Sequence, residues 1–129
     1  MKARLLDISN GFAVINKWGQ FKVTPRFGFN LARVAKVIEP ILSVYEAERA
    51  KLLNVYGTPP KGGVGNYLFE EGNLAKFNSA FAELLETDTD LPISPIPIKE
   101  LEDEAAKNAG FTPTLAELMA ISWLFEEEK

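Results

Sequence analysis

Three acidic side chains alternate along a short stretch in the second half of the chain. Glu86, Asp88 and Asp90 occupy every second position next to a proline-rich segment that predicts an extended backbone. Alternate side chains of an extended chain point to one side, about 6.5–7 Å apart. Such a row could hold a hard divalent cation if further oxygen ligands joined it. Carboxylates also keep edge strands from pairing with other chains. We favour this solvent-exposed role, with no metal ion.

A second acidic run follows a few residues later and consists of Glu100, Glu102, Asp103 and Glu104. On a helix these side chains spread around the axis, so the run predicts a solvated surface. Glu46 and Glu48 lie beside Arg49 in the central segment, but the Glu-x-x-His spacing of metal sites in helical bundles requires a histidine. We therefore predict no metal ligand in either place.

The chain contains neither histidine nor cysteine among its 129 residues. Their absence excludes Ser-His and Cys-His nucleophile systems, imidazole metal ligands, disulfides and iron–sulfur clusters. An enzyme would have to use carboxylates, Lys, Tyr or backbone groups, and the pattern of these residues singles out no catalytic centre. We predict a protein that is not an enzyme, with no cofactor and no evident small-molecule substrate.

Basic and aromatic residues are interleaved near the N-terminus, and FKVTPRFGF places three phenylalanines close to a glycine. This mixture can bind single-stranded nucleic acid, but a formal net charge of −4 argues against that. A domain with one long helix does not bury all of these rings, and an exposed apolar patch marks a protein contact. We predict a partner surface at Phe21, Phe27, Phe29 and Arg33, for another protein or a second copy.

Most of these aromatic residues belong to one long amphipathic helix expected over residues 24–56. Thr24 is a good N-cap, Pro25 fits the first helical position, and Gly57 follows the end. Apolar residues recur with a helical rhythm at Leu31, Val34, Ile38, Ile41, Tyr45, Leu52 and Val55. Pro40 removes one backbone hydrogen bond and predicts a kink.

The expected helix is longer than one small domain, because 33 residues at about 1.5 Å each span roughly 50 Å. The half after Pro40 has the cleaner apolar pattern. We therefore expect residues 41–56 to pack against residues 74–85 and the C-terminal helix. The half before Pro40, with its phenylalanines, is then left for a partner.

A helix is also expected over residues 3–18, although Asn10-Gly11 in its middle leaves a β-hairpin open as the alternative. Residues 57–65 predict a flexible loop, because their glycines and prolines suit neither helix nor sheet. Residues 66–70 alternate like a short strand. We expect them to form a two-stranded ribbon with the proline-rich segment 87–98.

Helical periodicity returns in the rest of the chain. Residues 74–86 form a strong amphipathic pattern, with Asn73 as a candidate cap, and residues 99–108 predict a short charged helix. The last helix begins near Thr114, which with Glu117 fits the capping box. It is apolar enough that it must dock onto another element, for which we expect the long helix.

These elements predict a single domain over residues 1–129 that is mainly α, or α+β at most. It is built around one long Pro-kinked amphipathic helix and has a small two-stranded ribbon. No apolar run approaches about 18 residues, so we expect no membrane span. The N-terminal residues lack the apolar core of a signal peptide. The expected location is the cytoplasm of a host cell, with association with a virion as an alternative.

Four stretches together resemble a family of small proteins of unknown function encoded by bacteriophages and prophages. They are LLDISNGFAVINKW, TPRFGFNLARVAKVIEPILSVYEAERAKLLNVYG, GNYLFEEGNLAKFNSAFAELLETDTDL and FTPTLAELMAISWLFEEE, which follow one another along most of the chain. Residues 99–111 look longer than the usual connection in that family. The resemblance carries over no catalytic residues. It implies a phage genome as the setting, in its structural or tail-assembly region.

Our leading hypothesis is a non-enzymatic phage or prophage accessory protein. It would act through protein–protein contacts, in virion or tail assembly, and could work as an oligomer. The alternative is a small regulator or inhibitor that binds a host protein or nucleic acid. An enzyme that uses Asp88 and Asp90 with a divalent cation is a more distant third hypothesis.

Overall fold

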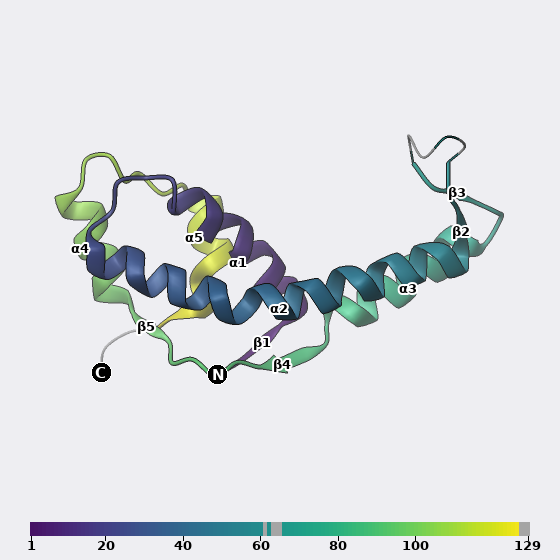
Figure 1. Ribbon diagram of the computed structural model, residues 1–129, viewed down its shortest axis with the longest axis horizontal. Helices are drawn as coiled ribbons and strands as arrows, with labels where there is room; N and C mark the ends of the chain where they lie inside the picture. The colour runs from purple at the N-terminus through teal and green to yellow at the C-terminus, as the bar shows by residue number, and fades with distance from the viewer. Residues whose placement is uncertain (61, 63–65, 127–129) are drawn as a thin grey trace.

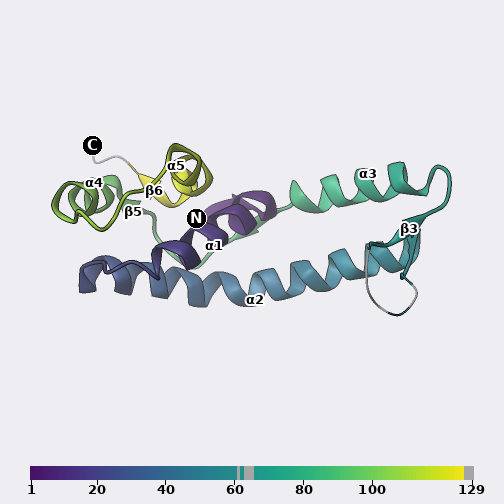
Figure 2. The same ribbon diagram turned by 90° about the horizontal axis from the view of Figure 1, so that it is seen from above.

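The longest element is helix α2, Pro25–Tyr56, which passes through Pro40 as one continuous helix (Figures 1 and 2). The computed structural model describes residues 1–60, 62 and 66–126. Thr24 precedes the helix in an extended conformation and Pro25 takes its first position, as the sequence predicts. Pro40 lies on the exposed side, where water can satisfy the carbonyl left without a helical donor. In Figure 2 the helix bows gently.

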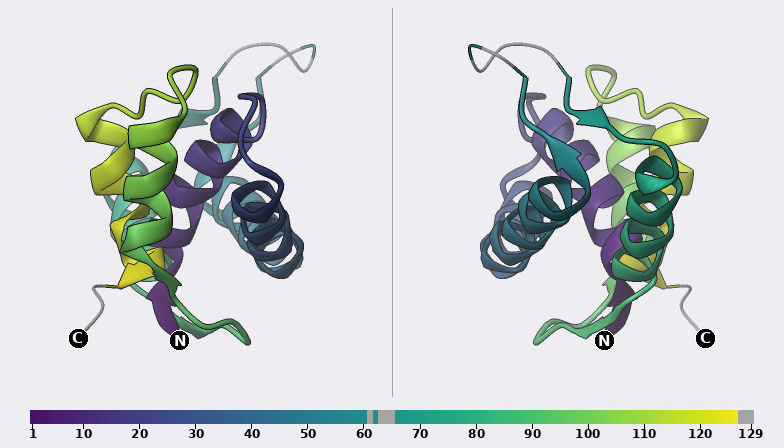
Figure 3. Two further views of the ribbon diagram at one scale, coloured as in Figure 1. Left: turned by 90° about the vertical axis from the view of Figure 1, so that its left-hand side faces the viewer. Right: turned by 90° about the vertical axis from the view of Figure 1, so that its right-hand side faces the viewer.

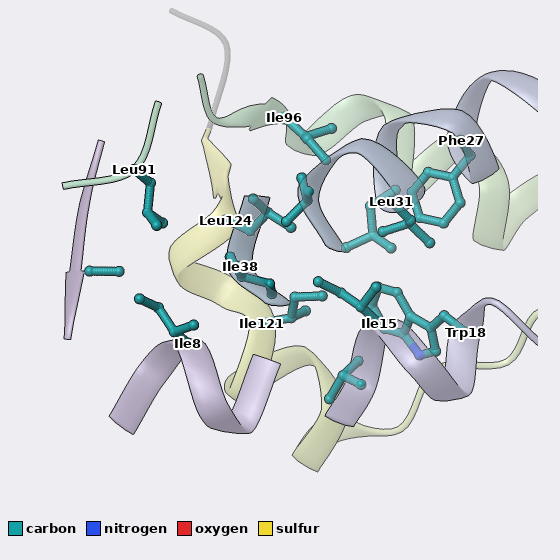
Figure 4. Packing of buried hydrophobic residues seen from close by; sticks show 14 of the residues in the cluster. Ile8, Ile15, Trp18, Phe27, Leu31, Ile38, Leu91, Ile96, Ile121 and Leu124 are labelled. Carbon is teal, nitrogen blue, oxygen red and sulfur yellow. The ribbon is translucent and has the colours of Figure 1, made fainter. Parts of the chain in front are cut away.

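The N-terminal part of α2 belongs to a compact end of the molecule, which we call the body. There it packs with α1 (Leu5–Trp18), α4 (Ile98–Lys107) and the C-terminal segment, which comprises α5 (Leu115–Ile121) and the 3-10 turn η2 (Ser122–Leu124). Side chains from all these elements meet in one core (Figure 4). Its most deeply buried members include Ile8, Trp18, Val34, Ile38, Phe111, Ile121 and Leu124. Each fully buried aliphatic side chain contributes roughly 1.5–3 kcal/mol.

The remaining part of α2 extends away from the body beside α3, Asn73–Leu85 (Figures 1 and 2). Residues 41–56 of α2, the strands β2 (Gly57–Thr58) and β3 (Leu68–Phe69), and α3 together form what we call the arm. Figure 3, on the right, looks along the arm onto the neighbouring ends of the two helices. The helix predicted over residues 74–86 is confirmed. It starts one residue earlier, and Gly72, at φ 84°, is the N-cap in place of Asn73.

We expected the half of α2 after Pro40 to pack in the core and the half before it to stay free, and this prediction is wrong in two respects. The half before Pro40 is the better buried one, with Phe27, Leu31, Val34 and Ile38 in the core, whereas Tyr45 is the one buried residue after it. The half after Pro40 packs on α3 as expected, but the C-terminal helix α5 docks mainly on α1. The reason is that the chain returns from α3 to the body, beside the N-terminus, before α4 and α5 form.

That return is made by a pair of strands. β4 (Asp88–Asp90) runs antiparallel to β1 (Lys2–Arg4), with Ala3 opposite Thr89. β3 pairs antiparallel with β2, and β5 (Ile96–Pro97) pairs in parallel with β6 (Phe125–Glu126). The predicted ribbon between residues 66–70 and 87–98 is therefore wrong, because both segments find nearer partners. The described residues form three two-stranded sheets in place of one.

Part of the predicted loop at residues 57–65 becomes β2, while residues 61 and 63–65 lie outside the described residues. The final helix is shorter than the apolar pattern suggested, because α5 gives way to the 3-10 turn η2 and then to β6. Ile121 and Leu124 point into the core, but Leu115 and Met119 are exposed. None of the helices in the described part of the chain has the length and apolar character needed to cross a membrane.

Helix α1 runs without interruption through Asn10-Gly11, so the helical prediction is confirmed and the hairpin alternative is wrong. Tertiary packing explains why a turn-favouring pair is tolerated here. A Cβ atom on Gly11 would lie 2.7 Å from the indole ring of Trp123, so only glycine lets the C-terminal segment approach α1 this closely. Trp123 is fixed in turn by donating its indole N–H to the carbonyl of Ala120 at 3.0 Å.

Replacing Gly11 with alanine tests this contact. At an exposed position in the middle of a helix, the same replacement would stabilise the protein by up to about 1 kcal/mol. We expect Gly11→Ala to lower the free energy of unfolding by about 1–3 kcal/mol, since the methyl group overpacks the contact. Urea unfolding measures the effect. The exposed Asn10→Ala serves as the control and should not destabilise. A stabilised Gly11→Ala protein would contradict the packing described here.

Candidate functional site

The four residues of the predicted partner surface do not come together. Phe27 lies in the core, and Phe21 is half-buried beside it. Phe29 is 66% exposed, and Arg33 is exposed one helical turn further on. Only Phe29 and Arg33 are thus available to a partner, and they do not form an apolar patch.

Phe111 is the aromatic residue that covers these phenylalanines, and no pattern in the sequence indicated this contact. It packs edge-on against Trp18, Phe21 and Phe27, with ring centroids 5.1, 6.1 and 5.5 Å away. Edge-to-face pairs of this kind contribute roughly 0.5–1.5 kcal/mol beyond the burial of their area. The phenylalanines that looked too numerous to bury therefore find a partner in a segment more than eighty residues away.

Glu86, the first of the three alternating acidic residues, forms an ion pair with Arg4 of β1. Glu86 accepts two hydrogen bonds from the guanidinium of Arg4, at 3.0 and 3.1 Å, and Arg4 also donates to Asp7. These hydrogen bonds, with that to Asp7 the strongest, raise the pKa of Arg4 above its ordinary value. Across the ladder, Asp88 faces Arg4 and Asp90 faces Lys2. The residues that the structure describes contain no group of three acidic side chains placed to hold a metal ion.

The second acidic run is not the uniform solvated surface that was expected, because Glu104 is only 4% exposed. Its carboxylate accepts hydrogen bonds from the Thr24 hydroxyl at 2.6 Å, from the Thr24 backbone N–H at 3.2 Å and from Asn108 Nδ2 at 2.9 Å. Burial alone would raise the pKa of Glu104, but these donors outweigh it and lower the pKa below its ordinary value. Glu104 thus anchors α4 to the N-terminus of α2, where the helix dipole also favours negative charge.

A cleft of about 230 Å³ lies beside this anchor, between the start of α2 and α4. Arg26 and Glu100 form an ion pair of 3.0 Å at its wall. Asp103, Lys107 and Asn108 complete the polar lining. Because Glu104 is already satisfied by protein donors, we interpret the cleft as part of the scaffold.

Glu117 is the second buried carboxylate and makes the predicted capping box with Thr114. The Thr114 hydroxyl accepts from the backbone N–H of Glu117 at 3.2 Å, and Glu117 accepts from the backbone N–H of Thr114 at 2.9 Å. Lys17 Nζ lies 2.6 Å from the other carboxylate oxygen, and the indole N–H of Trp18 donates at 3.4 Å. Lys17 and then Thr114 lower the pKa of Glu117 to about 2, against the effect of burial.

The most distinctive surface of the molecule is the arm. Among the described residues between Tyr45 and Leu91, none is buried, although this stretch is rich in leucine and phenylalanine. Val44 is 64% exposed and Val55 is 70% exposed. Leu68 is also mostly exposed, and Leu74 is half exposed. Of the seven large hydrophobic side chains that are exposed in the described part of the chain, four therefore lie on the arm.

Aromatic rings run along the inside of the arm. Phe77 stacks on Phe81 with centroids 5.7 Å apart, and Phe69 and Tyr45 extend the series at either end. The guanidinium of Arg49 lies over the Phe81 ring at 5.9 Å, a cation–π contact. A shallow groove lies on this side of the arm, with polar and aromatic walls. Its lining consists of Arg49, Leu53, Asn66, Tyr67, Phe69 and Phe77.

No protein-family model, curated protein or solved structure matches the chain in the comparisons made with each. The chemistry of its own residues must therefore carry the functional interpretation.

The residues that sequence reasoning missed are Glu104 and the exposed valines of the arm. Glu104 lies three positions after the buried Leu101, so its helical phase already placed it on the inner face of α4. Val55 continued the apolar rhythm of α2, and nothing in the local pattern shows that the body ends before it.

The role of Glu104 is tested by comparing two substitutions on the same helix. Glu104→Gln removes the charge that two Thr24 donors and Asn108 surround, so we expect a loss of about 1–3 kcal/mol in the free energy of unfolding at pH 7. Glu102→Gln, on the exposed side of α4, should change it by no more than about 0.5 kcal/mol. Equal effects in urea unfolding would show that Glu104 is not an anchor.

Glu117 makes stability depend on acid pH. Its folded-state pKa of about 2 lies below the ordinary value of 4.5, so its contribution is complete above pH 4.5 and is lost as the pH falls towards 2. We expect Glu117→Gln to flatten the stability profile in this range and to cost about 1–2 kcal/mol at pH 7. Lys17→Gln should reproduce part of the flattening. Thermal unfolding between pH 2 and pH 7 measures both, and an unchanged Glu117→Gln profile would exclude the effect.

Proposed function

We propose that this chain is a non-enzymatic protein that acts through protein–protein contacts made by its arm. The observation that carries the proposal is the absence of a buried side chain among the described residues between Tyr45 and Leu91. Leaving two amphipathic helices half covered costs the stabilisation that full burial would supply, about 25 cal/mol for each Å² of apolar surface. A partner on the arm would recover it.

The arm replaces the partner surface that the sequence predicted before Pro40, because Phe27, a member of that surface, is buried in the core. Backbone hydrogen bonds join the base of the arm to the body. Leu5 donates its backbone N–H to the carbonyl of Thr87 at 3.0 Å, and β1 pairs with β4 just after α3. These bonds fix the base of α3 against α1. The buried carboxylates of Glu104 and Glu117 serve this scaffold, which supports a role in binding over a role in catalysis.

The resemblance to small phage and prophage proteins supports an accessory role in virion or tail assembly, where contacts between proteins are the whole task. The alternative is a regulator or inhibitor that binds a host protein or nucleic acid. Both roles use a contact surface, and the partner found on the arm distinguishes them.

Site-specific photo-crosslinking in the native host tests the proposal. A photoreactive amino acid at Leu74, which is half exposed on α3, should give a discrete protein adduct. The same group at Lys107, exposed on α4 of the body, is the matched control and should give none.

The nature of the adduct then decides between the roles. A phage structural protein or a second copy of the chain supports the assembly role, whereas a host protein or nucleic acid supports the regulator. No adduct at Leu74, or equal adducts at both positions, would overturn the proposal that the arm makes the functional contact.

A further inference from the structure

Four exposed residues on one flank of the arm form a self-complementary pattern. Val44, Glu48, Lys51 and Val55 lie at spacings of four, three and four along α2. These spacings place all four on one side of the helix. Val44 and Val55 are 64% and 70% exposed, and the side chains of Glu48 and Lys51 are 47% and 70% exposed. The flank is therefore open to solvent along three turns.

The spacings and the pattern of valine, charged, charged, valine stay the same when the helix is read in the opposite direction, as in an antiparallel copy. A two-fold axis midway between Glu48 and Lys51 would place Val44 of one copy beside Val55 of the other at both ends. The same axis brings each Glu48, which already pairs with Lys51 of its own helix at 2.9 Å, beside the Lys51 of the other copy. An interface between identical chains needs this property, because the same patch must serve both sides.

The charges of the arm helices also suit association with a second copy. They carry three basic and three acidic residues, namely Arg49, Lys51, Lys76, Glu46, Glu48 and Glu83. The net charge of the arm helices is therefore zero, so two arms can associate without electrostatic repulsion. A strongly charged partner would gain no electrostatic attraction from this surface.

The chain exposes more surface than a compact monomer of its mass. The chain exposes 8472 Å². Folded monomers of 14.3 kDa expose only about 6,800 Å² according to the usual dependence of surface on mass. The difference of roughly 1,700 Å² is about twice the 800 Å² that each partner contributes to a standard specific interface.

We propose that the arm binds a second copy of this chain. The two arms lie antiparallel along the flank defined by Val44, Glu48, Lys51 and Val55. Each arm is an antiparallel helix pair, so two of them form a four-helix bundle, the arrangement in which such pairs usually bury their apolar sides. This inference rests on the proposed function of the arm and identifies its partner.

Sedimentation equilibrium of the purified chain tests the proposal, and the expected mass is that of a dimer in the micromolar range. Val44→Glu/Val55→Glu places four like charges in the interface, so we expect the dissociation constant to rise about a hundredfold or more. Met119→Glu is the matched control, because Met119 is equally exposed but lies on α5 of the body. It should leave the dimer unchanged, and circular dichroism confirms folding of each variant.

Charge reversal provides a second test, and mixing two variants separates contacts between copies from the Glu48–Lys51 ion pair within one helix. Glu48→Lys alone places lysines opposite one another, and Lys51→Glu alone places glutamates opposite one another, so each variant should be largely monomeric. A mixture of the two variants should form a heterodimer, because both pairs then have opposite signs. Glu48→Lys/Lys51→Glu in one chain should restore the homodimer.

Either of two results would overturn the inference. One is a wild-type chain that stays monomeric, and the other is a dimer that neither the valine nor the charge variants weaken. A monomer that still gives a position-specific adduct at Leu74 with another protein would refute self-association alone. A monomer without such an adduct would refute the proposed function as well.

Discussion

A helix of 32 residues cannot be covered by a body of this size. At about 1.5 Å per residue, α2 spans roughly 48 Å, more than three times the expected radius of gyration of a chain of this length. The rest of the structure follows from where the body sits along this helix. It sits at the N-terminal part, where α1, α4 and the C-terminal segment enclose Phe27, Leu31, Val34 and Ile38. The remainder of α2 receives a single companion helix, α3, and an uncovered arm results.

Two buried carboxylates hold the body together at the points where helices begin. Glu104 accepts hydrogen bonds from Thr24 at the start of α2, and Glu117 caps α5 while pairing with Lys17 of α1. Each ties a late segment of the chain to an early one and is satisfied by several donors. A buried charge is tolerated only with such partners, which explains why each carboxylate is surrounded by donors.

Much of the fold could be predicted from local patterns. Periodicity located the helices, and Pro25 and the Thr114–Glu117 box marked the starts of α2 and α5, because these signals act within one or two turns. The hydroxyl of Thr24, the expected cap of α2, binds Glu104 and makes no capping hydrogen bond to its own helix. The partners of elements could not be predicted. Gly11 lies inside a helix where its missing Cβ makes room for Trp123, and residues 87–90 pair with the N-terminus in place of residues 66–70. The candidate site was misplaced for the same reason, since the burial of Phe27 depends on the distant Phe111.

The pairing of α1 with the C-terminal segment has a consequence for synthesis on the ribosome. Trp18 and Glu117, which are hydrogen-bonded in the body, are 99 positions apart. At a typical 5–20 residues per second, α1 therefore waits roughly 5–20 seconds for the segment that covers it. The two helices of the arm are close neighbours in the chain and pair well before that. The nascent chain thus completes its arm before its body can close, and until then the side of α1 that the C-terminal segment covers stays exposed.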